Sequence, residues 1–413
     1  MQKLIKRPNY LEQLIENKDI DLVKIITGIR RCGKSTLLDL FHNYLLEMRI
    51  NEENIIHINF ESLKYKDIKT YIDLYDYISS KIKNSNKTYL IFDELQVVEH
   101  WEKAVESFRL DFNCDIYITG SNAYMLSSEF STLISGRYIE IKMLPLSFKE
   151  FLDFYNFDKM ISIEEKFQKY IQIGGMPVLH EFQNIENNIP RINQALEGIY
   201  STIILKDIVQ RNRQIDQVIL NKIIMFVCSN IGNITSTNNI ANVLSNEKEL
   251  DEAKNNVANS TINKYIKMLQ DTFFVYSVSR YDIKGKALLK TLEKNYIIDM
   301  GFRHLLLGYR NIDRGNILEN IVFLELLRRD YNVYIGKWKQ TEIDFIAEKP
   351  NEKIYIQVTE SLMNENTRNR ELQSLIKIED NYEKIVLSMD RDFEKSYDGI
   401  KVINIIDWLL EFK

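Results

Sequence analysis

The residues best suited to chemistry lie in a glycine-bounded stretch near the start of the chain, residues 28–36, which reads Gly-Ile-Arg-Arg-Cys-Gly-Lys-Ser-Thr. Its glycines and the Lys-Ser pair fit the phosphate-binding pattern G-x-x-x-x-G-K-[ST] at every fixed position. Lys34 would contact the β- and γ-phosphates of a nucleotide, and the Ser35 hydroxyl would ligate Mg²⁺. The predicted nucleotide site comprises Gly28, Ile29, Arg30, Arg31, Cys32, Gly33, Lys34, Ser35 and Thr36.

Two carboxylates end an apolar run at residues 88–94, Thr-Tyr-Leu-Ile-Phe-Asp-Glu. Such a run is typical of a buried parallel strand whose carboxyl end faces a ligand. In this Walker B interpretation Asp93 holds Mg²⁺ and Glu94 polarises the attacking water. A solvated acidic turn is the alternative, but the phosphate-binding stretch upstream favours the catalytic interpretation.

Two further positions could act on a phosphate. Residues 115–119 form an apolar strand that ends in Gly-Ser-Asn, so Ser121 or Asn122 could sense phosphate or orient water, with helix capping as the alternative. Arg137 precedes another strand and could stabilise transition-state charge on the nucleotide of a neighbouring subunit. An ion pair inside its own domain is the alternative for Arg137.

The elements that would position these residues follow from periodicity. An apolar strand at residues 22–27 leads into the glycine stretch, and apolar residues every three to four positions predict a helix after it. Another short strand is predicted at 54–60. Together, the strand–loop–helix pattern, the extra strand, Asp93-Glu94 and the Ser-Gly-Arg segment before Pro145 resemble an AAA+ ATPase, more narrowly the prokaryotic, archaeal-type ATPases.

This resemblance covers essentially the whole chain and implies ATP, Mg²⁺ and a five-stranded parallel sheet. Later landmarks of the family would be Gly174-Gly175-Met176-Pro177, which by itself indicates a simple turn between helices, and Lys206-Asp207-Ile208. A second phosphate-sensing arginine could be Arg191, Arg211 or Arg213. The resemblance does not imply a physiological target.

A basic region lies farther along. Residues 254–294 contain eight Lys or Arg and three acids, a balance of +5 in a chain of net charge −5. The order of helices and alternating strands between about 214 and 300 is typical of a winged helix-turn-helix. One interpretation places its second helix in a DNA groove and its wing on phosphates; the other is packing against protein alone. The candidate DNA contacts are Asn263, Lys264, Lys267, Lys284 and Lys286.

Acidic and amide side chains near the end of the chain resemble the metal ligands of the PD-(D/E)XK nuclease fold, at Glu319, Asp344 and Gln357. That fold expects a lysine two positions after the third ligand, where this chain has Thr359. Without the ammonium, water activation loses a major electrostatic contribution, unless a migrated lysine substitutes for it. The candidates are Lys337, Lys339 and Lys353. We therefore favour a nuclease-like binding or scaffolding domain over an active nuclease.

The predicted fold is α/β, with four parts: an AAA+ type parallel sheet flanked by helices (1–145), a helical lid (146–213), a winged helix (214–300) and a small PD-(D/E)XK-like domain (301–413). The length of 413 residues supports several domains, and 45% apolar with 27% charged residues is typical of a globular protein. No apolar run is long enough for a membrane span and no signal peptide is evident, so a cytoplasmic location is expected.

Other site chemistries are disfavoured by composition. Cys32, Cys114 and Cys228 are odd in number and widely spaced, and the five histidines form no H-x-x-x-H pair, which disfavours disulfides and transition metals. The favoured function is a Mg²⁺-dependent ATPase switch that acts on DNA or on a protein target. The protein could act as a homo-oligomer. The alternatives are a nucleotide-gated regulator with negligible turnover and an ATP-regulated DNA nuclease.

Overall fold

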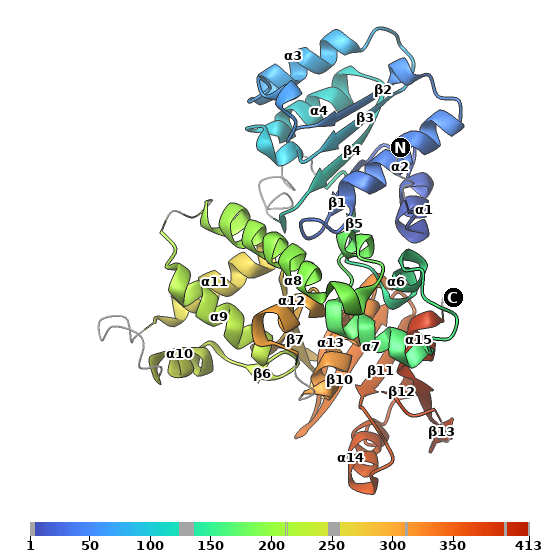
Figure 1. Ribbon diagram of the computed structural model, residues 1–413, viewed down its shortest axis with the longest axis vertical. Coiled ribbons are helices and arrows are strands. Elements are labelled where there is room, and N and C mark those ends of the chain that lie inside the picture. The colour runs from blue at the N-terminus through green and yellow to red at the C-terminus, as the bar shows by residue number, and fades with distance from the viewer. Residues whose placement is uncertain are drawn as a thin grey trace. The chain divides into compact units, whose positions relative to one another are not determined.

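The chain falls into two compact units. The computed structural model describes residues 5–123, 136–210, 212, 214–246, 257–309, 313–391 and 395–411 (Figure 1). Unit 1 holds Met1–Pro145 with Asp271–Phe273, and unit 2 holds Leu146–Gln270 with Phe274–Lys413. The boundary after residue 145 coincides with the predicted end of the nucleotide domain. The other three predicted parts lie together in unit 2.

Unit 1 contains a five-stranded sheet in the order β2-β3-β4-β1-β5 among the residues that the structure describes. Every neighbouring pair is parallel, which confirms the predicted parallel sheet. All its carboxyl strand ends therefore meet at one edge. The strands are β1 (Val23–Thr27), β2 (Ile55–Asn59), β3 (Thr88–Asp93), β4 (Cys114–Gly120) and β5 (Tyr138–Lys142).

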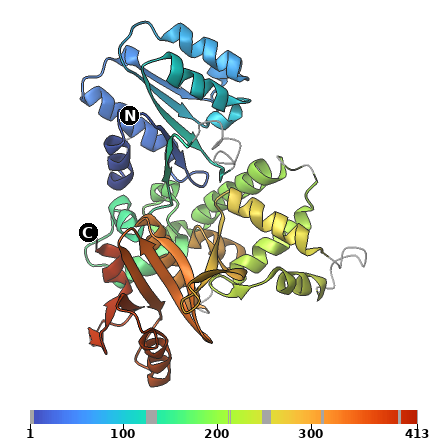
Figure 2. The same cartoon turned by 180° about the vertical axis from the view of Figure 1, so that it is seen from behind.

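Helices cover both faces of this sheet, α3 and α4 on one side and α1 and α2 on the other (Figures 1 and 2). The first pair buries an apolar cluster against the strands, with Phe92 and Phe108 among its members. Thr70 and Asp73 form a capping box that starts α3. The helices are α1 (Pro8–Glu16), α2 (Lys34–Glu47), α3 (Tyr71–Lys81) and α4 (Trp101–Asp111).

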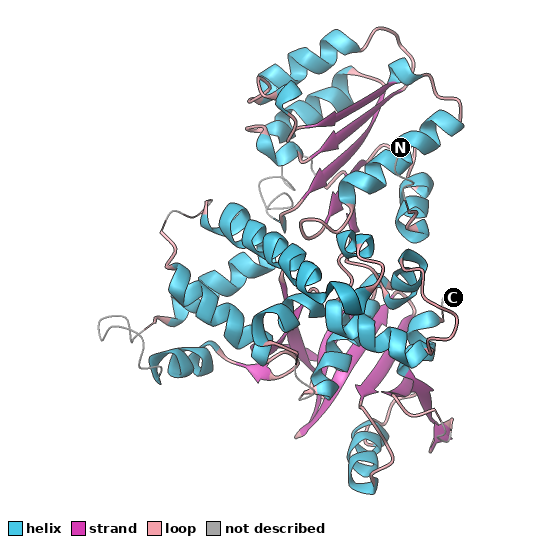
Figure 3. Ribbon diagram, in the orientation of Figure 1, coloured by secondary structure: helices cyan, strands magenta, loops and turns pink. Residues whose placement is uncertain are grey.

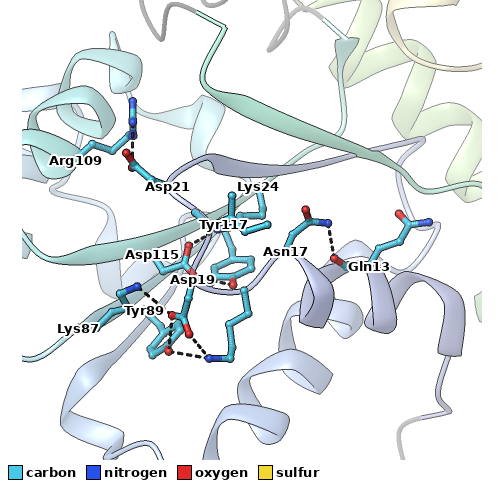
Figure 4. A network of polar contacts seen from close by, with 12 residues as sticks. Gln13, Asn17, Asp19, Asp21, Lys24, Lys87, Tyr89, Arg109, Asp115 and Tyr117 are labelled. Atoms are coloured by element: carbon cyan, nitrogen blue, oxygen red, sulfur yellow. Dashed lines mark hydrogen bonds and ion pairs between the residues drawn. The ribbon is translucent and has the colours of Figure 1, made fainter.

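A buried ion pair joins β1 to β4 near the amino ends of these two strands (Figure 4). Lys24 Nζ lies 2.5 Å from Asp115 Oδ1 and donates to the Ile20 carbonyl at 2.7 Å, and neither charged side chain is exposed. Tyr117 donates to the second carboxylate oxygen at 2.8 Å. Burial lowers the pKa of Lys24, while the Asp115 carboxylate opposes this change. Both charges are thus satisfied inside the sheet.

The first elements of unit 2 are helices, and their role as a lid stays a prediction. Within the described residues no helix is long and apolar enough to cross a membrane.

Lys206-Asp207-Ile208 lies within a π-helical segment, Ile203–Val209, that directly continues α8. The helices are α6 (Phe148–Phe154), α7 (Ile163–Ile173), α8 (Ile185–Thr202), α9 (Gln217–Ser229), α10 (Thr237–Asn246), α11 (Asn259–Asp271), α12 (Met300–Leu307), α13 (Arg314–Arg328), α14 (Glu365–Ile376) and α15 (Ile405–Leu410).

A nine-stranded sheet runs through the described part of unit 2, in the order β13-β14-β12-β11-β10-β9-β7-β8-β6 (Figure 3). Its strands are β6 (Ile234–Thr235), β7 (Val275–Asp282), β8 (Ala287–Ile297), β9 (Asn332–Trp338), β10 (Thr341–Lys349), β11 (Glu352–Val358), β12 (Glu383–Ser388), β13 (Ser396–Tyr397) and β14 (Ile400–Asn404).

The parallel pair β7–β9 crosses the boundary predicted at residue 300. Arg280 lies opposite Ile335, and Tyr281 lies opposite Gly336. The β7–β8 turn is anchored as well, because buried Ile283 joins an apolar cluster that includes Ile343 of β10. The hairpin predicted as a wing and the C-terminal strands therefore share one sheet and one core.

The Gly174-Gly175-Met176-Pro177 segment ends α7 beside a buried carboxylate. Asp299 accepts backbone N–H groups from Gly175 at 2.6 Å and from Gly301 at 2.8 Å. A Cβ at Gly174, whose φ is +77°, would lie 1.8 Å from Asp299 Oδ1. Burial raises the pKa of Asp299 to about 7, although the two N–H groups oppose the shift. The glycines thus allow the turn to close on Asp299.

This shifted pKa predicts a pH-dependent stability. Protonated Asp299 favours the folded state, so its contribution is complete below the ordinary pKa of 3.8 and is lost as pH rises through about 7. Denaturant unfolding of Asp299→Asn should lack this fall between about pH 4 and 7. Asp299→Ala should lose about 1–3 kcal/mol of unfolding free energy, because buried N–H groups lose their acceptor.

The matched control is Asp153→Asn, which changes an exposed aspartate on α6. Its pH dependence should follow that of the wild type. Equal pH slopes for Asp299→Asn and the wild type would show that this carboxyl does not titrate in the stated range.

Candidate active site

The glycine stretch forms a tight loop between β1 and α2. Gly28 has φ +147°, and a Cβ there would lie 2.1 Å from the Met143 carbonyl oxygen just beyond β5. Gly33, at φ +103°, is the last residue before α2. Both positions need glycine, one for close approach and one for backbone conformation. Ser35 is exposed in the first turn of α2, where N–H groups and the helix dipole favour an anion.

Lys34 is folded back onto its own loop. Its Nζ donates to the carbonyls of Gly28 at 2.9 Å and Ile29 at 3.2 Å, and it lies 4.0 Å from Glu94 Oε1. The Lys34 side chain is only 4% exposed. The carbonyl oxygens that accept these bonds are neutral, whereas an anionic phosphate oxygen in their place would add the attraction between opposite charges.

Asp93 lies at the end of β3 between two neighbouring strands. Asn59, the last residue of β2, donates to Asp93 Oδ2 at 2.9 Å. Thr119 on β4 donates to Oδ1 at 2.5 Å. These contacts orient the buried carboxylate at the edge where the phosphate loop lies. The sequence interpretation missed both Asn59 and Thr119, although strand-end polar residues are a usable signal.

Glu94 follows in a left-handed backbone conformation, with φ +55°. Its N–H donates to Thr119 Oγ1 at 2.9 Å, so one threonine orders both acids. Ser121 donates to Glu94 Oε2 at 3.2 Å, and the Gln96 amide donates to the same oxygen. Ser121 and Glu94 therefore lie together, the role of Ser121 at a phosphate or a water stays a prediction, and Gln96 was not predicted. Asn122 is also buried at this strand end.

A histidine pair lies close to the acids. His57 on β2 has its Nδ1 3.1 Å from Nδ1 of His42 on α2. Burial, followed by the charge of His42, lowers the pKa of His57 to about 4, although Asp93 opposes the shift. His57 is consequently neutral at physiological pH and adds no positive charge near Asp93.

Arg7 anchors the start of the chain to the phosphate loop. Its guanidinium donates to the carbonyls of Cys32 at 3.1 Å, Leu144 at 2.8 Å and Pro145 at 3.3 Å. It also stacks 4.5 Å from the ring centroid of Tyr10. The sequence analysis assigned no role to this region, because a single arginine before a helix carries no motif. In the structure Arg7 ties the loop backbone to the end of β5.

Arg137 lies at the opposite end of the sheet from its own phosphate loop. Its carbonyl accepts from Val23 N at the amino end of β1, whereas the loop leaves the carboxyl end. The guanidinium is 56% exposed and lies 3.9 Å from Glu106, so the alternative ion pair within its domain is present but weak. A role at a nucleotide therefore requires a second subunit and stays a prediction.

The structure does not choose among the three candidates for a second phosphate-sensing arginine. Arg191 is an exposed residue of α8 in unit 2, and Arg211 and Arg213 lie outside the described residues. The candidate DNA residues share one property, which is exposure. They are Asn263, Lys264 and Lys267 on α11, and Lys284 and Lys286 in the turn between β7 and β8.

The nuclease-like acids surround a lysine that sequence reasoning missed. Lys294 on β8 has its Nζ 2.9 Å from Glu319 Oε1, 2.8 Å from Glu342 Oε1 and 3.8 Å from Asp344 Oδ1. Gln357 accepts from Asp344 N at 2.7 Å. The three predicted ligands thus come together. Thr359 is buried beyond them on the chain and donates to the Ser361 carbonyl.

Lys294 is not among the three lysines proposed as substitutes for the missing catalytic lysine. Lys353 pairs with Glu348 at 2.8 Å, Lys337 lies on β9, and Lys339 is exposed in the next turn. Burial alone would lower the pKa of Lys294, but the carboxylates, with Glu319 contributing most, raise it above its ordinary value. Burial raises the pKa of Glu319 and of Asp344. The carboxylates therefore favour the charged form of Lys294.

Comparisons with known protein families divide the chain into three matches. Residues 21–152 match the AAA domain model. Residues 164–313 match a domain of unknown function, DUF8612, and residues 314–408 match another, DUF4143. The last boundary falls just before α13, whereas the sheet of unit 2 continues across it.

Among solved structures, an Aeropyrum pernix ORC2 protein in ADPNP–ADP complexes has a TM-score of 0.41 at 9% identity, over 78% of this chain and 92% of that one. AMPPCP-bound DnaA from Aquifex aeolicus has a TM-score of 0.32 at 14% identity, over 65% and 89%. Both similarities are distant.

Two uncharacterized proteins are similar along nearly the entire chain. One, from Haemophilus influenzae, is 42% identical over 99% of both chains. Another, from Methanocaldococcus jannaschii, is 31% identical over 92% of this chain and 86% of its own. With the phosphate loop, the paired acids and the AAA domain match, these similarities show that the chain belongs to the AAA+ superfamily of P-loop ATPases, in one family with these two proteins.

Proposed function

We propose that this protein binds ATP with Mg²⁺ and hydrolyses it, and that the cycle acts as a switch on DNA or a protein target. One observation carries the proposal: Lys34 and Glu94 lie 4.0 Å apart at the edge where Asp93 ends its strand. Nucleotide hydrolysis needs a cation that contacts the phosphates, a ligand for the metal ion and a general base. Lys34, Asp93 and Glu94 would supply these three groups.

The residues of unit 1 can divide the chemistry among them. Lys34 would turn from the loop carbonyls toward the β- and γ-phosphates. Glu94 would accept a proton from the attacking water, and Ser121 would help to orient Glu94. Gln96 holds the same carboxylate oxygen as Ser121, so it positions the base without touching substrate.

The residues present fit Mg²⁺. Ser35 is an exposed hydroxyl in the first turn of α2, and Asp93 is a carboxylate fixed by Asn59 and Thr119, and both offer the oxygen ligands that Mg²⁺ prefers. When bound, Mg²⁺ would neutralise charge on the phosphate oxygens. Asp93 and Ser35 would supply only some of the ligands of Mg²⁺. Phosphate oxygens and water molecules usually supply the others.

The second unit offers a surface for DNA. Its elements α9, β6, α10, α11, β7 and β8 follow the order expected of a winged helix, with α11 as recognition helix and residues 283–286 as wing. The exposure of Lys264, Lys267, Lys284 and Lys286 supports contacts with phosphates. Asn263 on the same helix could read a base edge. A protein target is the alternative use of this surface.

Replacement of Glu94 by Gln should separate binding from hydrolysis. We expect Glu94→Gln to bind ATP as the wild type does, because the amide keeps the shape and the hydrogen bond from Ser121. Phosphate release should fall by roughly 10²–10⁴-fold, because the amide cannot take a proton. Fluorescent-nucleotide titration and a phosphate-release assay measure the two quantities.

Glu99→Gln, an exposed change beyond the acids, is the control and should leave both quantities intact. If Glu94→Gln keeps the wild-type rate, Glu94 is not the base. If it loses hydrolysis yet supports full cellular function, ATP occupancy alone operates the switch.

Reversing four charges should test DNA binding. Changing Lys264, Lys267, Lys284 and Lys286 to Glu should weaken binding in a gel-shift titration and reduce the dependence of log affinity on log salt by about 0.9 for each lost phosphate contact. The control carries the same charge change on exposed lysines of unit 1, at Lys64, Lys66, Lys69 and Lys83. Equal affinity and salt slope in both variants would exclude this DNA surface.

Mixing variants should test Arg137. Alone, Arg137→Ala should lose about 10³–10⁵-fold in phosphate release if the guanidinium completes a neighbour's site, as arginine fingers do. Mixed with Glu94→Gln, it should regain activity, because the Glu94→Gln subunit supplies Arg137 to an intact site.

The control mixture replaces the second partner by the double variant Glu94→Gln/Arg137→Ala, which supplies no arginine and should restore nothing. Absence of recovery in the first mixture, with oligomers seen by light scattering, would mean that Arg137 does not act between subunits.

A further inference from the structure

The acid cluster of unit 2 contains its own cation. Lys294 contacts Glu319 and Glu342 at 2.9 and 2.8 Å, and Asp344 lies 3.8 Å away. These carboxylates come from α13 and β10, so one ammonium joins two elements to β8. The Lys294 side chain is 4% exposed. Three acids converging on one buried charge is the arrangement otherwise expected around a divalent metal.

Several atoms of the predicted ligands already hold hydrogen bonds within the protein. Asp344 Oδ2 accepts from Val358 N at 2.8 Å. The Gln357 amide accepts from Asp344 N and donates to Glu371 Oε2 at 2.5 Å. Tyr296 donates to Glu319 Oε1 at 2.5 Å. Consistently, no group of three Asp, Glu, His or Cys side chains within the described ranges is disposed to hold a metal ion.

Lys294 cannot easily withdraw from the cluster. Its backbone is paired on both sides, opposite Ile234 of β6 and Val278 of β7. On the other side of Glu319, a Cβ at Gly232 would lie 3.2 Å from Oε2, so the loop before β6 packs tightly there. A divalent cation at the cluster would face the ammonium at short range in a medium of low dielectric constant, which strongly disfavours both together.

We propose that Lys294 permanently fills the cation position of this cluster, so that the acids form an ionic link between β8, α13 and β10 and bind no divalent metal. The domain then keeps the ligand set of a metal-dependent phosphodiesterase without its metal. Removing the ammonium should convert the cluster into a divalent-cation site, because the carboxyl groups of Glu319, Glu342 and Asp344 would remain close together without a cation between them.

The test is Mn²⁺ binding to the full-length protein without nucleotide, followed by electron paramagnetic resonance. Wild-type binding should not change when Asp344 is replaced by Asn. Lys294→Met should gain a Mn²⁺ site, and the double variant Lys294→Met/Asp344→Asn should lose it again. Lys401→Met removes a lysine from an exposed ion pair with Glu383 and should gain nothing.

Either of two results would overturn the proposal: wild-type Mn²⁺ binding that depends on Asp344, or folded Lys294→Met, judged by circular dichroism, that gains no site. A measurement on the wild type covers the case in which Lys294→Met does not fold. Amine acylation followed by mass spectrometry should leave Lys294 unmodified with or without millimolar Mn²⁺, and labelling that rises with Mn²⁺ would show that the metal displaces the lysine.

Discussion

The buried pair of Lys24 and Asp115 is the interaction on which the nucleotide site depends. It holds β1 against β4 in the centre of a parallel sheet, at the end remote from the phosphate loop. A slip of one residue in that register would turn every side chain of β1 to the opposite face. The lysine and the aspartate are satisfied only in the observed pairing, so the pair specifies the register.

That register determines what meets at the other end of the sheet. β1 leads through the phosphate loop to Lys34, the first residue of α2. β3 ends at Asp93, and β4 carries Thr119 and leads to Ser121. Thr119 donates to the Asp93 carboxylate and accepts from the backbone N–H of Glu94. This one hydroxyl group therefore aligns both acids. The close approach of Gly28 to Met143 similarly fits the loop against the end of β5.

The sequence was sufficient for the residues whose roles are local. The phosphate loop and Asp93-Glu94 could be predicted because spacing along the chain directly determines their backbone geometry and their place at strand ends. Arg7, Asn59 and Gln96 could not, since their partners are determined by which strands become neighbours. Lys294 is the clearest case: the three candidate lysines, Lys337, Lys339 and Lys353, all follow residue 301, whereas the ammonium comes from β8.

Domain organisation shows the same limit. The sequence pattern after residue 214 predicted helices and strands. However, the alternation of apolar residues indicates only which face of a strand is buried and does not indicate which strand lies beside it. Hence the parallel pair of β7 and β9 was not foreseen. The close packing of Gly174 against Asp299 was also hidden, because a glycine pair by itself indicates only a turn.

The continuous sheet of unit 2 has a mechanical consequence. The turn at residues 283–286 joins β7 to β8, and only the last three residues of β7, Arg280 to Asp282, pair with β9. Force applied at that turn would therefore load the backbone hydrogen bonds between these three residues and β9 and pass from there into β10. If the nucleotide cycle proposed above moves the hairpin, the strands of the same sheet would move with it.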